Sequence, residues 1–248
     1  MPEDVQGVWD TAAESWSHFV DSGRDRFKLH VILPALLGLL PSTAPGARAL
    51  DLCCGEGFYS RTLRELGFDV QGVDLSAKMI ALARAKQSAI PYHCADAAHV
   101  PFEEGSFDVV LSAMGLMDAP NLAEILAEVR RVLAPGGQFV FSITHPCFSF
   151  EKAGGWEKGP GGKEFFKMDD YFTEDTVEVP WDMEGILYPF TTIIYHRTLS
   201  TYVNALTAAG FAVERMVEPT IDRERGRELG LEVCARVAYF LAMRCRAV

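Results

Sequence analysis

The chain has 248 residues, 49% of them hydrophobic, and a formal net charge of −11 at pH 7. This is enough apolar material for one large domain, and the excess of acids disfavours nucleic acid, whose phosphates a binding protein must offset with Lys and Arg. No stretch reaches the roughly 18 uncharged apolar residues of a membrane span, and the acidic N-terminus lacks a signal-peptide core, so we expect a cytoplasmic protein without a membrane segment.

The first predicted element is an N-terminal helix. Trp9, Ala13 and Trp16 recur at helical spacing and form one apolar stripe, which is typical of a helix that packs on a sheet. The following segment, residues 17–30, is predicted to be a mobile lid in which Arg24 could pair with a carboxylate. Residues 1–45 together form the predicted N-terminal helical lid.

The next feature is the segment ALDLCCGEGFYS, residues 49–60. An apolar run stops at a Gly-x-Gly turn, Gly55 and Gly57, and a helix follows; the second strand then ends in Asp74. This is the pattern of one half of a nucleotide-binding α/β sheet. Glycines let the backbone approach a ligand, and a carboxylate after the second strand can accept both ribose hydroxyls, so the pattern predicts a bound adenosine compound.

The same segment discriminates between adenosine cofactors. A dinucleotide site has a third glycine, which lets the helix pack closely and meet a pyrophosphate, but this chain has Ser60 there. Asp51, on the first strand, would be poorly placed beside a pyrophosphate and well placed for an ammonium group. A nicotinamide-dependent oxidoreductase is therefore disfavoured, and we expect a partly cationic ligand.

Five more strands and two helices are expected along the chain. A short third strand is closed by residues 93–96, and residues 105–118 contain a fourth strand with the nearly continuous apolar run of a strand buried on both faces. An amphipathic helix over 122–134 is broken by Pro-Gly-Gly at 135–137 before a fifth strand. Beyond these we predict a helix over 200–209, a strand over 211–217 and a last strand over 233–244.

Taken in this order, the motifs resemble those of the class I S-adenosylmethionine (SAM)-dependent methyltransferases over roughly residues 1–148. The resemblance implies one α/β domain over 1–248, with a Rossmann-like, mostly parallel seven-stranded sheet whose last strand is antiparallel. It implies SAM as the cofactor, with contacts from Asp51, Cys53, Gly55 and Gly57 to the methionine part, Asp74 and Leu75 to the ribose, Met79, Asp96 and Ala97 to the adenine, and Ser112, Ala113 and Met114 beneath the sulfonium. Many family members carry tyrosines at the positions of Trp9 and Trp16, and the second aromatic reaches the methionine end, so Trp16 is a further candidate.

Methyl transfer is an in-line displacement, and orientation of the two reactants can supply most of the rate. A hydroxyl or acidic carbon as acceptor would also need a general base within hydrogen-bond reach. The candidates are His145, at the carboxyl end of the fifth strand, His196, just before the late helix, and Asp118, after the fourth strand. Each has a structural alternative as a loop or helix-terminus residue. The six cysteines form no C-x-x-C pair, and no metal site is predicted.

Residues 148–192 are predicted to be an inserted substrate cap, because this long segment is rich in aromatic residues that need burial. The aromatics that could line a pocket for a planar or apolar acceptor, or else pack within the cap, are Trp156, Phe165, Phe166, Tyr171, Trp181 and Tyr188.

The predicted function is transfer of a methyl group to a small, neutral or cationic molecule. Two alternatives stay open. A methyltransferase acting on a modified nucleoside in RNA would require a basic surface near the strand ends. A SAM-binding or adenosine-binding protein without catalysis is disfavoured by the intact set of motifs, Asp51, Gly55, Gly57, Asp74 and Asp96.

Overall fold

The chain is described by a computed structural model over residues 4–42, 45–148 and 155–248. Parts of the predicted lid (1–45) and of the predicted cap (148–192) therefore lie outside the described residues. Within these ranges, no helix has the length and apolar character needed to cross a membrane.

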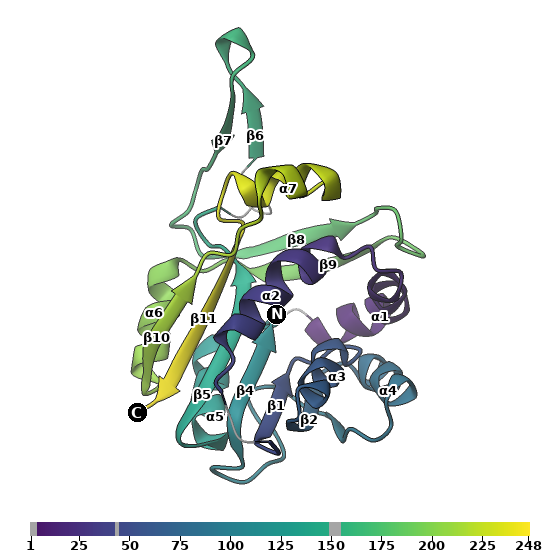
Figure 1. Cartoon of the computed structure of the whole chain (residues 1–248), viewed down its shortest axis with the longest axis vertical. Coiled ribbons are helices and arrows are strands. Elements are labelled where there is room, and N and C mark those ends of the chain that lie inside the picture. Colours follow the sequence, from purple (N-terminus) through teal and green to yellow (C-terminus); the bar gives the residue numbers. More distant parts are fainter. Residues whose placement is uncertain (1–3, 43–44, 149–154) are drawn as a thin grey trace.

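The core of the fold is a seven-stranded sheet in the order β10-β11-β5-β4-β1-β2-β3 (Figure 1). Its strands are β1 (Arg48–Leu52), β2 (Asp69–Asp74), β3 (Tyr92–Cys94), β4 (Phe107–Ala113), β5 (Leu133–Thr144), β10 (Phe211–Val217) and β11 (Phe240–Ala247). β11 is antiparallel to both β5 and β10, and the other neighbouring strands are parallel. This confirms the predicted α/β class and the Rossmann-like, mostly parallel sheet with an antiparallel last strand.

Helices cover both faces of this sheet. The α-helices are α1 (Val5–Asp21), α2 (Leu33–Leu39), α3 (Phe58–Glu65), α4 (Ala77–Lys86), α5 (Leu122–Val132), α6 (Leu199–Ala208) and α7 (Arg223–Leu229). Short helical turns are η1 (Lys28–Ile32), which is a π-helix, and η2 (Leu116–Asp118), η3 (Pro160–Gly162) and η4 (Glu232–Ala235). Several helices begin at a side chain that accepts a backbone N–H of the first turn: Asp4, Ser76, Thr198 and Asp222.

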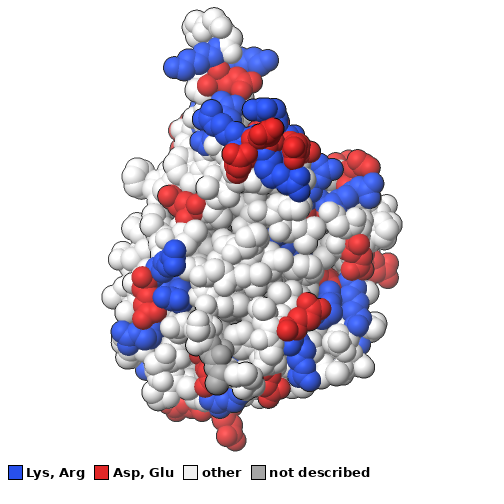
Figure 2. Space-filling view, in the orientation of Figure 1, with Lys and Arg blue, Asp and Glu red and all other residues white. Residues whose placement is uncertain are grey.

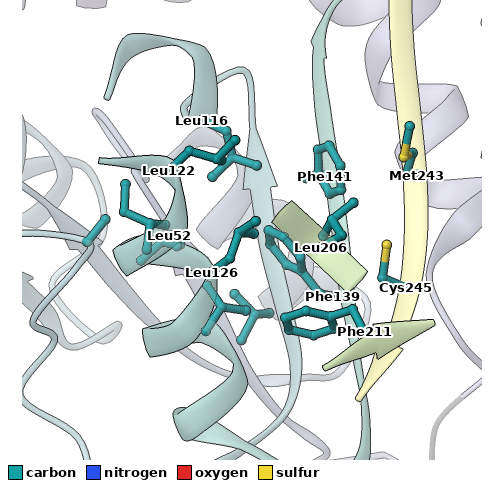
Figure 3. Packing of buried hydrophobic residues seen from close by; sticks show 14 of the residues in the cluster. Leu52, Leu116, Leu122, Leu126, Phe139, Phe141, Leu206, Phe211, Met243 and Cys245 are labelled. Atoms are coloured by element: carbon teal, nitrogen blue, oxygen red, sulfur yellow. The ribbon is translucent and has the colours of Figure 1, made fainter. Parts of the chain in front are cut away.

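The sheet separates two apolar clusters, and β5 contributes to both. Phe139 and Phe141 pack with α5 and α6 on one face, as Figure 3 shows, whereas Val140 belongs to the cluster that includes α2 and α3 on the other. Alternation of side chains along a strand explains this division. Strands buried on both faces need continuous apolar sequence, which is what the segment around Phe139 provides.

The strand order places a functional crevice. The chain leaves β1 toward β2 on one side, and β4 lies on the other side of β1. In open α/β sheets, ligands bind beyond the carboxyl ends of the strands where the order reverses in this way. The segments that follow β1 and β4 therefore frame the expected site.

The described part of the inserted segment forms two hairpins. β6 (Gly155–Lys158) pairs with β7 (Glu164–Lys167) in a ribbon that projects away from the body, whereas β8 (Thr176–Trp181) and β9 (Phe190–Tyr195) lie beside α1 (Figure 1). On the face drawn in Figure 2, basic side chains of the projecting ribbon and of α7 lie next to acidic ones. Ion pairs such as Arg236–Glu164 and Arg225–Glu228 account for this mixture.

Several element boundaries differ from the prediction. The strand predicted over 211–217 has those bounds, and the late helix starts one residue early, at Leu199. The last strand begins at Phe240, because the apolar pair Val233 and Cys234 lies in η4, where the Cys234 side chain is buried. β5 begins at Leu133, before the Pro-Gly-Gly turn, which forms a bulge with a shift in pairing register against β4.

Candidate active site

A cavity of about 810 Å³ opens over the carboxyl ends of β1 and β4. This is toward the upper end of the roughly 300–1,000 Å³ that small-molecule sites occupy. Its walls come from three parts of the chain: the turns after β1, β2 and β4, the N-terminal segment from α1 to η1, and the β8–β9 hairpin. Residues from α7 to β11 close the remaining side.

The turn after β1 keeps its backbone open to the cavity. Gly55 and Gly57 have φ angles of 55° and 85°, a region that glycine adopts without strain. A Cβ on Gly55 would meet no atom within 4 Å, so this side of the turn is free for a ligand, whereas a Cβ on Gly57 would lie 2.5 Å from the Tyr92 hydroxyl. Gly57 is therefore required for packing, and Gly55 for the shape of the cavity wall.

Cys53 lies in the same turn and adopts a φ of 59°, which is unusual for a residue with a side chain. Its Cβ is directed at Gly115, where an added Cβ would lie only 2.4 Å away. Burial raises the pKa of the Cys53 thiol well above its usual value, and the charges of Asp74 and Asp118 raise it further. The thiol lines the cavity and stays protonated.

Asp74 links the turn after β1 to the end of β2. Its Oδ2 accepts the backbone N–H of Gly55 at 2.8 Å, and its Oδ1 accepts that of Ser76 at 2.9 Å. Burial raises the pKa of this carboxyl, while these backbone hydrogen bonds oppose the rise. Each carboxylate oxygen has a second lone pair, so Asp74 can accept two further hydrogen bonds from a ligand in the cavity.

Asp51 lies beneath the cavity rather than on its wall. It is 1% exposed and accepts a 2.6 Å hydrogen bond from the Ser60 hydroxyl. Burial raises the pKa of Asp51 to about 7, and the charges of Asp74 and Glu56 act in the same direction. Asp51 is not among the residues that line the cavity, and its predicted contact with a ligand stays a prediction. Ser60, which replaces the third glycine, is the partner of this carboxylate.

The remaining predicted cofactor residues divide in the same way. The residues that line the cavity are Trp16, Cys53, Gly55, Asp74, Leu75, Met79, Asp96, Ala97, Ala113 and Met114. Ser112 does not; it is fully buried, and its hydroxyl has no hydrogen-bond partner among the described residues. Gly57 also lies behind the wall, as the first turn of α3 begins there.

Of the three predicted bases, Asp118 lines the cavity. His145 is 3% exposed and lies off the wall: its Nδ1 accepts the Cys147 N–H at 3.1 Å, and its Nε2 lies 3.1 Å from a Glu218 oxygen. Burial lowers the pKa of His145. His196 also lies off the wall, with its Nε2 2.8 Å from the Tyr171 carbonyl oxygen. Both imidazoles hold loops together, so they correspond to the structural alternative.

The N-terminal helix and the β8–β9 hairpin meet over the cavity. The rings of Trp16 and Trp181, which both line it, pack edge to face with centroids 5.0 Å apart. The Ser15 hydroxyl donates to the Tyr188 carbonyl at 3.0 Å and accepts the Leu187 N–H at 3.0 Å. These contacts join two segments that are more than 170 positions apart in the sequence.

Of the six cap aromatics, Trp181 lines the cavity and the other five do not. Trp156 and Phe166 pack on each other in the projecting β6–β7 ribbon, with ring centroids 5.4 Å apart. Tyr171 accepts the Leu199 N–H at the start of α6, and Tyr188 donates to a backbone carbonyl of α1. The structure thus gives most of these rings packing or capping contacts.

Lys28 lines the cavity although sequence reasoning did not single it out. Its Nζ lies 5.2 Å from the ring centroids of both Trp16 and Phe58. The sequence signal was misleading, because Lys28 belongs to a run of alternating acids and bases that is typical of a solvated surface.

The wall fits an adenosyl ligand with an amino-acid end. The open turn at Gly55 admits a ligand against the backbone, the Asp74 oxygens can receive ribose hydroxyls, and Met79 offers an apolar surface to a base. No group of three His, Cys, Asp or Glu side chains in the described parts of the chain is arranged to hold a metal ion.

Comparison with known proteins gives consistent matches. Residues 50–141 match the methyltransferase domain family. The crystal structure of an S-adenosylmethionine-dependent methyltransferase from Mesorhizobium loti is 34% identical, with a TM-score of 0.70, over 86% of this chain and 96% of that one.

Two curated relatives are matched over shorter regions. The demethylmenaquinone methyltransferase of Beutenbergia cavernae is 34% identical over 60% of this chain and 62% of the relative. The malonyl-[acyl-carrier protein] O-methyltransferase of Serratia marcescens is 35% identical over 51% of this chain and 49% of the relative. The matched region thus spans less than two thirds of either enzyme.

Proposed function

The chain belongs to the S-adenosylmethionine-dependent methyltransferases, and from this premise we propose that it methylates a small, largely apolar molecule with a planar part. SAM is the methyl donor that the family implies, and it supplies an electrophilic methyl group on a sulfonium. We place its adenosine part between Asp74 and Met79 and its methionine part at the glycine turn after β1.

The observation that carries the proposed acceptor class is an aromatic wall of the cavity. Its rings come from α1, the residue before η1, β8 and the two residues at the start of β11 and just before it: Trp16, Phe19, Phe27, Trp181, Tyr239 and Phe240. Such a surface binds flat apolar groups through burial and ring stacking. We infer that the acceptor lies between this wall and the ends of β4 and β5.

Asp118 is the residue that we propose to contact the reacting atom of the acceptor. It follows β4 and lines the cavity, and its charge acts on the nearby Cys53 thiol. A carboxylate there can accept a proton from an acceptor hydroxyl as the methyl group transfers. Because the Cys53 thiol stays protonated, it does not compete with the acceptor as a nucleophile.

The closed arrangement of α1 and β8–β9 supports a role in excluding water and fixing the acceptor. Edge-to-face packing of Trp16 on Trp181 keeps these rings in one orientation. Orientation of the reactants is the main contribution that a protein can make to this displacement. We therefore retain the predicted lid and cap roles, for α1 and for the β8–β9 part of residues 148–192.

The names of the matched relatives support a small acceptor without choosing one. One name specifies demethylmenaquinone and the other a malonyl group on a carrier protein. The aromatic wall favours a ring-shaped acceptor over a malonyl group. RNA is less favoured, because basic side chains at the rim such as Arg24 are paired with acids.

A transfer assay with a panel of acceptors tests the proposal. Formation of S-adenosylhomocysteine (SAH) should be stimulated by phenols, quinols or hydroxylated heteroaromatics and not by aliphatic amines or transfer RNA. With the best acceptor, Asp118→Asn should lower kcat by about 100-fold or more while SAH binding stays within threefold of wild type. Stimulation by RNA alone, or an unchanged kcat in Asp118→Asn, would contradict the proposal.

A further inference from the structure

Three basic side chains line the cavity, and they differ in burial. Arg24 is 45% exposed and pairs with Glu184 at 2.7 Å. Arg26 is exposed and donates to the Leu229 carbonyl at 2.8 Å. Lys28 is only 12% exposed. A buried cation in a cavity needs an anionic partner, because burial in a less polar medium disfavours an unpaired charge.

The surroundings of Lys28 place its ammonium beside the glycine turn. Phe58, whose ring it faces, directly follows Gly57 at the start of α3, and the other ring that it faces is Trp16 of the lid. Lys28 also begins the π-helix η1, a rare structure that occurs frequently at functional sites. The ammonium therefore lies where the turn after β1 and the N-terminal lid meet.

The protein itself gives this ammonium one described carboxylate. Asp25 Oδ2 lies 3.4 Å from the Nζ, which is longer than a good charge-assisted hydrogen bond. An ammonium has three donors, so Lys28 can bind a second carboxylate without releasing Asp25.

Tyr59 is a second polar residue near Asp25, but its hydroxyl is not open to the cavity. Tyr59 lines the cavity and is 7% exposed, and its hydroxyl has no hydrogen-bond partner among the described residues. Burial raises the pKa of Tyr59, and the charges of Asp25 and Asp51 raise it further, so the hydroxyl keeps its proton. The hydroxyl oxygen has less than 1 Å² of accessible surface, so a ligand in the cavity does not reach it, and Lys28 is left as the donor on this side.

We propose that Lys28 binds the α-carboxylate at the methionine end of the cofactor. This inference rests on the proposed placement of SAM at the glycine turn. It transfers to Lys28 the role that the sequence suggested for Arg24, whose guanidinium is held at the rim by Glu184. The Trp16 ring then shields this ion pair from water, since it lies on the side of the ammonium that faces the lid.

The test compares two ligands that differ in the amino-acid end. SAH carries the carboxylate, whereas 5′-methylthioadenosine keeps the adenosine and the sulfur and lacks the amino acid. In calorimetric titrations of the full chain, Lys28→Gln should weaken SAH binding by about 10- to 100-fold and leave the binding of 5′-methylthioadenosine within twofold. Tyr59→Phe, which removes a hydroxyl that is closed off from the cavity, should leave the binding of both ligands within twofold.

Two further variants control for charge and for folding. Arg24→Gln removes the same charge at the rim and should change SAH affinity by less than threefold. Asp25→Asn combined with Lys28→Gln tests whether the unpaired Asp25 carboxylate repels the ligand; the selective loss should persist in this double variant. Unchanged 5′-methylthioadenosine binding in every variant serves as the check that the site is still folded.

The outcomes separate this inference from the proposed function. Equal weakening of both ligands by Lys28→Gln, or no weakening of either, would overturn the carboxylate role of Lys28 while wild-type binding of SAH still supports the cofactor site. A larger loss in Arg24→Gln than in Lys28→Gln would return the role to Arg24. Failure of the wild-type chain to bind either ligand would instead contradict the placement of SAM on which the inference rests.

Discussion

The two walls of the cavity are built in different ways. The cofactor wall is formed mainly by the turns that follow β1 and β2, and it is held by backbone groups that donate to one carboxylate, Asp74. The aromatic wall, which we propose holds the acceptor and call the acceptor wall, joins α1 to the β8–β9 hairpin through side chains, such as Trp16 on Trp181 and the hydroxyl of Ser15. A wall made of backbone suits one constant ligand, whereas a wall made of side chains can change with the acceptor.

The largest expected effect is on the cofactor wall. Asp74→Asn should weaken SAH binding by about 100-fold or more, because two ribose hydrogen bonds to a charged acceptor contribute about 1.5–3 kcal/mol each. The amide oxygen of the variant can still accept the Gly55 N–H, so the fold should persist. Calorimetry with SAH measures the change. The matched control is Asp69→Asn, at the exposed other end of β2, which should stay within twofold.

If Asp74→Asn bound SAH with unchanged affinity, the Asp74 carboxylate would not be the group that binds the cofactor, and this account of the cofactor wall would be wrong. A fall in affinity that comes with loss of the folded state, seen by circular dichroism, would assign Asp74 a structural role instead.

A second difference between the two walls is the buried carboxylate of Asp51, which lies beneath the cofactor wall. In its charged form, which prevails above neutral pH, this carboxylate opposes folding. Its pKa is raised from 3.8 to about 7. The folded state therefore binds this proton more tightly than the unfolded state. The contribution of this proton to the free energy of unfolding is fully present below about pH 4. It is lost as the pH rises to about 7, at about 1.4 kcal/mol per pH unit.

The variant Asp51→Asn removes this titration and keeps an acceptor for the Ser60 hydroxyl. Without ligand, Asp51→Asn should be more stable than wild type. This difference in the free energy of unfolding should grow by about 2–3 kcal/mol from pH 5 to pH 8. Urea denaturation of both proteins at the two pH values measures the gain. A difference between the two proteins that does not change with pH would mean that Asp51 does not titrate in this window.

Ser15 tests the acceptor wall in the same manner. Ser15→Ala removes the hydroxyl that holds the backbone of Leu187 and Tyr188, and a buried hydrogen bond of this kind contributes about 1–2 kcal/mol. We expect hydrogen exchange of these two amides to accelerate about 10-fold, with SAH affinity within threefold. Ser22→Ala is the control, because Ser22 bonds within its own segment, to the Phe19 carbonyl at 2.7 Å. If Ser15→Ala also weakened SAH binding by about 10-fold, the two walls would not be separate.

The same division explains what the sequence predicts. The Gly-x-Gly turn and Asp74 lie close to one another along the chain, and periodicity and turn chemistry report such local features directly. The mostly parallel seven-stranded sheet with an antiparallel last strand came from the family resemblance, and the strand over 211–217 has its predicted bounds. The last strand was predicted too early, because apolar residues such as Cys234 are buried in a short helical turn as well as in a strand.

The positions of single polar side chains relative to the cavity were harder to predict. His145 and His196 satisfy every local criterion for a base, but their ring nitrogens are engaged by loops that the sequence does not place. Lys28 belongs to a charged run that is usually solvated, and its burial depends on rings from α1 and α3. Contacts between distant segments decide such cases, and one sequence alone does not report them.

The smallest expected effect concerns Cys53, the strained residue of the cofactor wall. Its left-handed backbone costs about 1–2 kcal/mol for a residue with a side chain, and Cys53→Gly removes that cost. The gain is offset by the entropy of glycine, about 0.5–1 kcal/mol, and by the lost contacts of a half-buried thiol, so stability should change by less than about 1 kcal/mol.

Cys54 is the matched control for this change. It is the next residue and more deeply buried, and it does not have a positive φ. Cys54→Gly should therefore destabilise the protein by about 2–3 kcal/mol, because it adds the entropy cost and a cavity without relieving strain. Urea denaturation of the two variants at pH 7 measures both. If Cys53→Gly costs as much as Cys54→Gly, the Cys53 side chain stabilises the wall through its contacts, and the backbone account of that wall is incomplete.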